Sequence, residues 1–266
     1  MKRLTEVLQN KYKNYIFPFL WLRGEDEEIL RDYVRKIYES GIKALCIEAR
    51  PHPDFLGNKW WKDVDAIMDE AKKHNMKVWL LDDSHFPTGF ANGRVKKDFP
   101  QYQKKYLKIH QLDFAGPLDE ASLLIKWGSP QTKFVLNQKA IPHQDNILKI
   151  IAAKRTGSSS VDPETLIDIT EHQKNNFLNW NIPDGQWRIF VLIETYGGGE
   201  PHTEGYLNPL VAEATQILIN EVYEPHYQHY KDEFGKTFAG FFSDEPRFGN
   251  MHGAEGSIGR TEMVYP

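Results

Sequence analysis

Four short apolar runs of the sequence are each followed by polar or charged residues. In chain order, the residues that follow them are Arg23, then Glu48, then Asp82 with Asp83, then Asp244 with Glu245. Carboxyl groups exchange protons and accept hydrogen bonds from vicinal hydroxyl groups. If the runs are parallel strands, their carboxyl ends share one edge of a sheet, where ligands bind. The pattern therefore predicts a polar pocket at that edge. The alternative is that the charged residues simply terminate the strands at a solvent-exposed edge and bind nothing.

The apolar runs alternate with helical patterns. The predicted strands are residues 16–22, 44–47 and 78–81, and helical spacing follows the first run up to Gly41 and the second from Trp60 to Asn75. A strand, helix, strand order repeating about every 30 residues is typical of parallel βα units.

A different pattern occupies residues 107–195. Apolar and polar residues alternate there with a period of two, at 132–136, 147–151 and 187–193. This period predicts strands of an inserted, sandwich-like all-β module. A helix is then expected at 208–234, kinked at Pro225, followed by a fourth strand at 238–242.

The predicted fold class is α/β, a partial (β/α)8 TIM barrel of about four βα units with an inserted β-rich module. Residues 1–106 form the first part of the barrel, 107–195 the insertion, and 196–266 the return to the barrel with its acidic loop. A complete barrel has eight strands, and an exposed strand edge is a liability. We therefore expect the missing C-terminal half of the barrel, or an oligomer partner, to pair with these strands.

Composition narrows the classes of partner. The 266 residues are 40% hydrophobic and 26% charged, with a net charge of −4, which argues against nucleic acid or an anionic membrane. No apolar run is long enough to span a bilayer, and the N-terminus lacks the apolar stretch of a secretory signal. A cytoplasmic protein is expected. Cys46 is the only cysteine, and it is predicted to pack in the core.

Several segments resemble the α-L-rhamnosidase-like glycoside hydrolases. They are residues 19–24 (FLWLRG), 82–93 (DDSHFPTGFANG), 178–187 (LNWNIPDGQW) and 240–246 (GFFSDEP). The resemblance implies a TIM-barrel catalytic domain interrupted by a β-rich insertion. The sequence departs from that pattern at Arg23, where Asn is more usual, and at Asn92, where Gly is expected.

The resemblance implies that Glu245 donates a proton to the leaving oxygen of a glycoside. We expect nearby phenylalanines, Phe241, Phe242 and Phe248, to desolvate this carboxyl group and raise its pKa. The alternative is an acidic loop residue before Pro246. The second carboxylate that glycoside hydrolysis needs would come from a later strand, so the 266-residue chain alone is expected to be inactive or nearly so.

Other polar and aromatic residues at the strand ends are predicted to bind the sugar. Each of these residues also has a simpler structural role. Asp82 could cap a turn, and Glu48 could form an ion pair with Arg50. Trp21 could simply pack against its neighbours, which is the more common role for aromatic rings such as Phe86 and Trp60. The predicted substrate-binding set is Asp82, Asp83, His85, Glu48, Trp21 and Asp244.

No cofactor is expected to be required, and the metal ligands, if any, stay unknown. The resemblance suggests a Ca²⁺ ion held by carboxylates at the strand ends. His226 and His229, one helical turn apart, have no third ligand placed by the sequence, so we predict surface histidines. The predicted function is hydrolysis of an oligosaccharide or glycoside, with rhamnose favoured by resemblance. The alternative is a non-catalytic carbohydrate-binding or assembly fragment in which residues 107–195 do the work.

Overall fold

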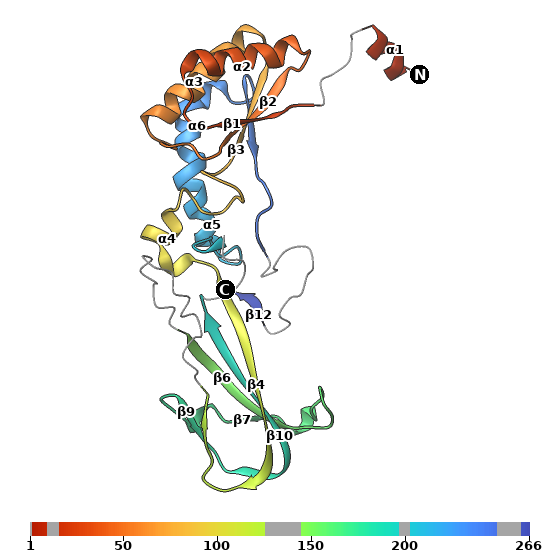
Figure 1. Ribbon diagram of the computed structural model, residues 1–266, viewed down its shortest axis with the longest axis vertical. Coiled ribbons are helices and arrows are strands. Elements are labelled where there is room, and N and C mark those ends of the chain that lie inside the picture. The colour runs from red at the N-terminus through yellow and green to blue at the C-terminus, as the bar shows by residue number, and fades with distance from the viewer. Residues whose placement is uncertain (1, 10–15, 126–144, 197–202, 249–261) are drawn as a thin grey trace. The chain divides into compact units, whose positions relative to one another are not determined.

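The computed structural model describes residues 2–9, 16–125, 145–196, 203–248 and 262–266, and it divides into two units (Figure 1). The first unit contains residues 1–103 and 205–247, and the second contains residues 104–204 and 248–266. The predicted insertion at 107–195 falls within the second unit. The predicted strand at 132–136 lies outside the described residues.

A four-stranded parallel sheet forms the centre of the first unit. Its order is β1-β2-β3-β11, and its strands are β1 (Phe19–Leu22), β2 (Ala44–Ala49), β3 (Lys77–Leu81) and β11 (Phe238–Phe242). Helices α2 (Glu27–Glu39) and α3 (Asn58–Lys73) follow β1 and β2. The four strands and two helices predicted here are confirmed to within a few residues.

The helices bury one face of this sheet. In α2, Leu30 and Val34 are spaced by one helical turn and are fully buried, as expected for an amphipathic helix on a sheet. They share a core with Leu22, Leu45 and the helix α3. Acidic residues in the first turn of α2 favour its start.

The opposite face of the sheet is curved and rich in aromatic side chains. Side chains alternate between faces along a strand, so Phe19 and Trp21 lie opposite the partly buried Leu20 and the buried Leu22. In a flat sheet, three steps of about 4.8 Å would separate the edge strands by roughly 14 Å. The rings of Phe19 on β1 and Phe242 on β11 nevertheless lie 5.3 Å apart. The sheet is therefore concave on this face.

The segment before β11 is helical but not continuous. It consists of α5 (Ala212–Leu218), a π-helical turn η5 (Ile219–Tyr223), α6 (Glu224–Tyr230) and a 3-10 turn η6 (Lys231–Glu233). Pro225 lies in the first turn of α6. Since proline donates no backbone hydrogen bond, the helix changes its hydrogen-bonding pattern just before it. The predicted interruption at Pro225 is confirmed, and the helix starts at Ala212 rather than Asn208.

The second unit contains two antiparallel sheets. The larger has the order β12-β4-β10-β6-β7 and the smaller β5-β9-β8, and side chains from both share one core that includes Ile150, Leu178 and Val191. Their strands are β4 (Lys105–Leu118), β5 (Ser122–Leu124), β6 (Asn146–Lys154), β7 (Ile167–Asp168), β8 (Gln173–Lys174), β9 (Phe177–Asn179), β10 (Ile182–Thr195) and β12 (Glu262–Tyr265). Residues 196–266 are predicted to return to the barrel. That prediction is corrected at β12, which pairs with β4 through backbone hydrogen bonds.

Short elements complete the described chain. They are the helices α1 (Lys2–Leu8) and α4 (Arg94–Asp98) and the 3-10 turns η1 (Pro100–Tyr102), η2 (Pro163–Thr165) and η3 (Thr170–His172). Within the described residues, no helix has the length and apolar character needed to cross a membrane. The fold class is therefore mixed α/β, with one parallel and two antiparallel sheets.

Candidate functional site

The carboxyl end of β3 continues into a loop that closes around Asp83. The Asp83 side chain is completely buried. Its two oxygens accept five backbone N–H hydrogen bonds, at distances of 2.6 to 3.0 Å, from residues Ser84, Gly89, Phe90, Ala91 and Asn92. A carboxylate offers about four lone-pair positions. Its hydrogen-bonding capacity is therefore taken up by the loop, and the structure gives Asp83 a role in holding this loop rather than a sugar.

Asp82 connects the loops after β3 and β11. Its carboxylate accepts hydrogen bonds from the hydroxyl groups of Thr88, at 2.5 Å, and Tyr223. The Thr88 hydroxyl also accepts the backbone N–H of Asp244 at 3.0 Å, and the Thr88 N–H donates to the Asp244 carbonyl at 3.1 Å. Asp82 is fully buried, so in this conformation it positions the Asp244 backbone without facing a ligand.

Among the carboxyl groups of the site, Asp82 has a pKa that burial raises. Burial raises its pKa from 3.8 to about 6, against the hydrogen bonds from Thr88 and Tyr223, which favour the charged form. Between these two pKa values the folded protein keeps a proton that the unfolded chain has lost. Folding stability must therefore fall as the pH rises from about 4 to about 6.

The substitution Asp82→Asn should remove this dependence. A shift of about two pKa units corresponds to about 3 kcal/mol. Relative to the unmodified protein, the variant should thus gain that amount in free energy of unfolding between about pH 4 and pH 7. Urea denaturation at both pH values measures it, with the exposed Asp54 changed to Asn as the control. If the variant and the unmodified protein differed in free energy of unfolding by the same amount at both pH values, Asp82 would not carry the proposed proton.

Glu245 lies on an anchored loop after β11. Thr88 fixes the preceding residue, and the Tyr206 hydroxyl accepts the backbone N–H of Arg247 at 2.9 Å. Glu245 itself adopts a left-handed backbone conformation with φ of +41°, which is uncommon for a residue other than glycine and is often found at functional sites. Its carboxylate lies 3.5 Å from the Arg247 guanidinium.

The expected apolar surroundings of Glu245 are not found among the described residues. Its side chain is 63% exposed, and Phe248 is exposed as well. Phe241 instead packs into the core beside Tyr223. The Phe242 ring contacts that of Phe19 on β1. The prediction that these phenylalanines desolvate Glu245 is therefore wrong, because most of the Glu245 side chain faces solvent.

The ends of β1 and β2 bring together two arginines and two aromatic rings. Trp21 is in register with Glu48, and the buried Glu48 forms an ion pair with Arg50. The Arg50 guanidinium carbon lies 5.1 Å from the Trp21 ring centre and 5.7 Å from that of Phe86. The contact with Phe86 connects this side of the edge to the loop after β3. The predicted alternative for Glu48, an ion pair with Arg50, is confirmed.

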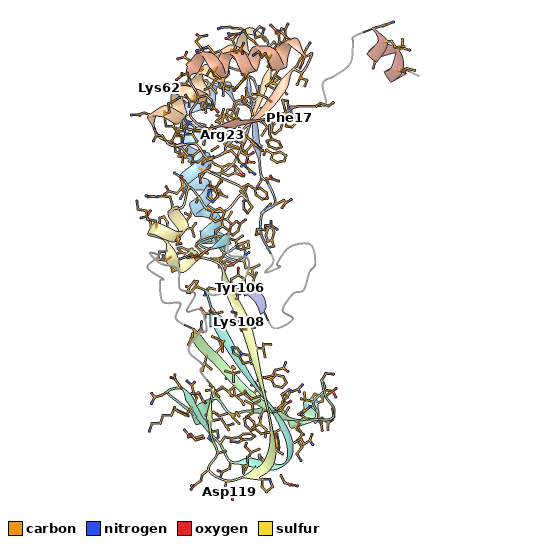
Figure 2. The ribbon with its side chains drawn as sticks, viewed as in Figure 1. Phe17, Arg23, Lys62, Tyr106, Lys108 and Asp119 are labelled. Atoms are coloured by element: carbon orange, nitrogen blue, oxygen red, sulfur yellow. The ribbon has the colours of Figure 1, made fainter. Side chains whose placement is uncertain are left out.

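Arg23 follows β1 on the same edge (Figure 2). Its guanidinium carbon lies 5.8 Å from the Trp21 ring centre, and its Nε donates to the Arg50 carbonyl at 3.1 Å. Trp21 is about half exposed. The predicted sugar-stacking ring therefore also contacts two guanidinium groups.

Two further predicted residues are available at the edge. His85 is exposed, stacks on Phe90 and has its Nδ1 2.9 Å from the Ser84 hydroxyl. The Asp244 side chain is partly exposed. Together with Trp21 and Glu245, these are the predicted residues that a ligand can reach, whereas Asp82, Asp83 and Glu48 are buried.

Sequence reasoning missed Thr88, Tyr206 and Tyr223, the three hydroxyl-bearing residues that hold the loops together. Thr88 lies between Pro87 and Gly89 in the loop after β3. Tyr206 fills the space beside Gly89, where an added Cβ would approach the tyrosine ring to 2.2 Å. Both tyrosines are far along the chain from the loops they join, and no local pattern marks them.

Trp60 and His226 belong to the core. Both are fully buried, and the Trp60 indole N–H donates to His226 Nε2 at 2.9 Å. Burial lowers the pKa of His226 to about 4. The prediction that His226 is a surface histidine is wrong, because it faces the aromatic residues of α3, whereas His229 stacks on Trp61 and is partly exposed. Cys46 is buried as expected, and burial raises its pKa to about 12.

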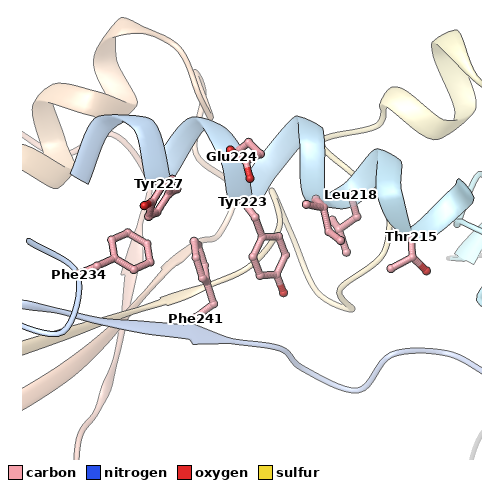
Figure 3. A pocket seen from close by; sticks show the side chains of 8 residues that line it. Thr215, Leu218, Tyr223, Glu224, Tyr227, Phe234 and Phe241 are labelled. Carbon is pink, nitrogen blue, oxygen red and sulfur yellow. The ribbon is translucent and has the colours of Figure 1, made fainter. Parts of the chain in front are cut away.

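An apolar groove runs along the helical segment 212–230 beside β11 (Figure 3). Its volume is about 480 Å³. Tyr223, Tyr227, Phe234 and Phe241 line it, together with Leu218. Tyr223 connects the groove to the site, because its hydroxyl binds Asp82.

Three of the carboxylates at the strand ends, those of Asp82, Asp83 and Glu48, are already engaged by other groups of the protein, which leaves them poorly suited as Ca²⁺ ligands. Asp83 is occupied by backbone N–H groups, Asp82 by two hydroxyl groups, and Glu48 by Arg50. Across the described part of the chain, no three His, Cys, Asp or Glu side chains gather as a metal site.

The fold is similar to that of solved structures of known proteins. A rhamnosidase from Novosphingobium sp. PP1Y is similar over 87% of this chain, with a TM-score of 0.51 and 11% sequence identity. This chain spans 38% of the length of that protein. No family model and no curated protein sequence matches. The likeness supports a related fold.

Proposed function

We propose that this chain carries part of a glycoside hydrolase site, with Glu245 as the proton donor. The observation that carries the proposal is the Glu245 loop itself. A solvent-facing carboxylate is held in a left-handed conformation, between two anchored neighbours, at the carboxyl edge of a parallel sheet. The structural likeness to a rhamnosidase supports the glycosidase part of the proposal, not the choice of Glu245.

The barrel is part of the proposal. Four parallel strands curve around an aromatic concave face and carry helices on the other face, as one arc of a (β/α)8 barrel would. In the described sheet β1 and β11 are the edge strands. We propose that a complementary βα segment, in the same polypeptide or in an oligomer partner, pairs with β11 and covers the groove at Phe234 and Phe241. That segment would supply the second carboxylate.

The substrate is proposed to be an oligosaccharide or glycoside, with an α-L-rhamnoside as the first compound to test. His85, Asp244 and Trp21 are the groups at the edge that can contact it. No cofactor is needed for glycoside hydrolysis by two carboxyl groups. The protein is proposed to act in the cytoplasm.

Mapping of glycoside binding by NMR tests this proposal. Methyl α-L-rhamnoside should shift the backbone amide signals at the strand ends, including Arg23, Arg50, His85 and Glu245. Methyl α-D-glucoside at the same concentration is the comparison. Shifts confined to residues 104–204 would instead support the alternative, a carbohydrate-binding module in the second unit. Absence of shifts with either sugar would contradict both.

A further inference from the structure

The edge of the parallel sheet has two chemically different sides. On the side formed by β3 and β11, the carboxylates that a ligand can reach are those of Asp244 and Glu245, whereas Asp82 and Asp83 are buried. The side formed by β1 and β2 carries Arg23 and Arg50, both within 6 Å of the Trp21 ring. A ligand that spans this edge meets acids at one end and guanidinium groups at the other.

Arg50 is held in place before any ligand arrives. It contacts the rings of Trp21 and Phe86 and forms an ion pair with Glu48, whose side chain is 4% exposed. Contacts of this kind orient a guanidinium with little loss of conformational entropy on binding. Glu48 balances the charge of Arg50.

Arg23 is different because its charge is not balanced by direct contact. Only the Nε of its guanidinium forms a hydrogen bond among the described residues, and it donates that bond to the Arg50 carbonyl. Among the described residues its guanidinium forms no ion pair, and its two Nη groups have no hydrogen-bond partner. The nearest acid along the chain, Glu25, accepts the Arg23 backbone N–H at 2.8 Å rather than the side chain.

We propose that the Arg23–Arg50 pair binds a carboxylate group of the substrate, so that the glycoside carries a uronic acid unit beside the bond that is cleaved. Two parallel N–H groups of a guanidinium match the two oxygens of a carboxylate. The half-exposed Trp21 ring contacts both guanidinium groups and helps to orient them. This assignment rests on the proposed glycosidase function and adds the substrate class to it.

Binding of two matched sugars to the intact chain tests the proposal without any need for turnover. Methyl β-D-glucuronide and methyl β-D-glucoside differ only in a carboxylate that replaces a hydroxymethyl group. Ligand-detected NMR titrations should show roughly ten-fold tighter binding of the glucuronide, the size expected for a charge-assisted hydrogen bond. The substitution Arg23→Gln should abolish this preference and leave glucoside affinity within about two-fold.

Two further variants separate recognition from general charge. Arg23→Lys keeps the charge but loses the two-pronged geometry, so it should recover only part of the preference. Arg35→Gln removes a partly exposed arginine on α2 and should leave the preference for the glucuronide unchanged. Thermal unfolding of each variant confirms that it is folded.

The outcomes distinguish this inference from the function it extends. Equal binding of both sugars, or an unchanged preference in Arg23→Gln, would overturn the uronate site while leaving the glycosidase proposal to its own test with the rhamnoside. Acetate binding as tightly as the glucuronide would also overturn it, because the site would then recognise any small anion. No binding of the glucuronide would refute it as well.

Discussion

Replacing Asp83 with alanine is expected to lower the free energy of unfolding of the first unit by about 4 kcal/mol, within the range for losing a buried charged partner. The carboxylate accepts five backbone N–H groups in an environment without solvent access. Removing it leaves these donors without partners, and each buried unsatisfied group costs about 1–3 kcal/mol before relaxation and water entry reduce the sum. Few single side chains in the described structure hold as many backbone groups.

In the intact chain, the rate of hydrogen exchange of peptides from β2 and β3 is measured at increasing urea concentrations. It gives the free energy of unfolding of the first unit separately from that of the second. Asp83→Asn keeps one oxygen acceptor and should lose less than Asp83→Ala. Asp54→Ala is the control, since Asp54 is exposed and accepts one backbone N–H from Lys59. If Asp83→Ala and Asp54→Ala were equally stable, the loop around Asp83 would not depend on its carboxylate.

Replacing Glu245 with glutamine is expected to slow glycoside hydrolysis by about 10²- to 10⁴-fold, the usual contribution of general acid catalysis. The amide is nearly the same size but has no proton to donate at neutral pH. Because Glu245 is 63% exposed and makes only a 3.5 Å ion pair with Arg247, its replacement should leave stability almost unchanged. A loss of rate would therefore reflect chemistry.

Release of 4-methoxyphenol from 4-methoxyphenyl α-L-rhamnoside measures this effect, because a poor leaving group depends most on proton donation. Turnover by the 266-residue chain alone is expected to be slow, so the assay uses protein in excess of substrate. Glu28→Gln, an exposed carboxylate in the first turn of α2, is the matched control and should keep the full rate. Equal rates for Glu245→Gln and Glu28→Gln would remove Glu245 from the mechanism.

The strands of the first unit could be predicted from the sequence because their residues are uniformly apolar and end at charged positions. Residues 238–242 match β11, and 78–81 lie within β3. Acidic residues at the ends of parallel strands were correctly placed on one edge, since that follows from strand direction alone. The strand β12 was missed, because its partner β4 is more than 140 positions away in the chain and only that pairing makes it a strand.

The roles of the individual acidic residues at this edge of the sheet could not be predicted from the local sequence. Glu245 and Asp82 are both acids after apolar strands, and the sequence does not show which one is desolvated. Asp82 is buried because Tyr223 and Thr88 close over it, and Tyr223 comes from a helix 141 positions away. Desolvation depends on such distant contacts.

One departure from the family pattern has a simple physical reason. Asn92, at a position where glycine was expected, has a φ of +55°. Asparagine tolerates this left-handed conformation better than most residues other than glycine. The backbone of the loop around Asp83 can therefore be formed with either residue. Arg23, the other departure, has no such conformational explanation and is the residue assigned here to the uronate.

The dependence of the Glu245→Gln defect on the leaving group tests the role of Glu245 most directly. A proton donor assists a poor leaving group, such as 4-methoxyphenol, much more than 2,4-dinitrophenol, which departs as a stable anion. We predict that the variant loses roughly 100-fold or more in rate on the 4-methoxyphenyl rhamnoside but less than about ten-fold on the 2,4-dinitrophenyl rhamnoside. The same loss on both substrates, or none on either, would contradict proton donation by Glu245.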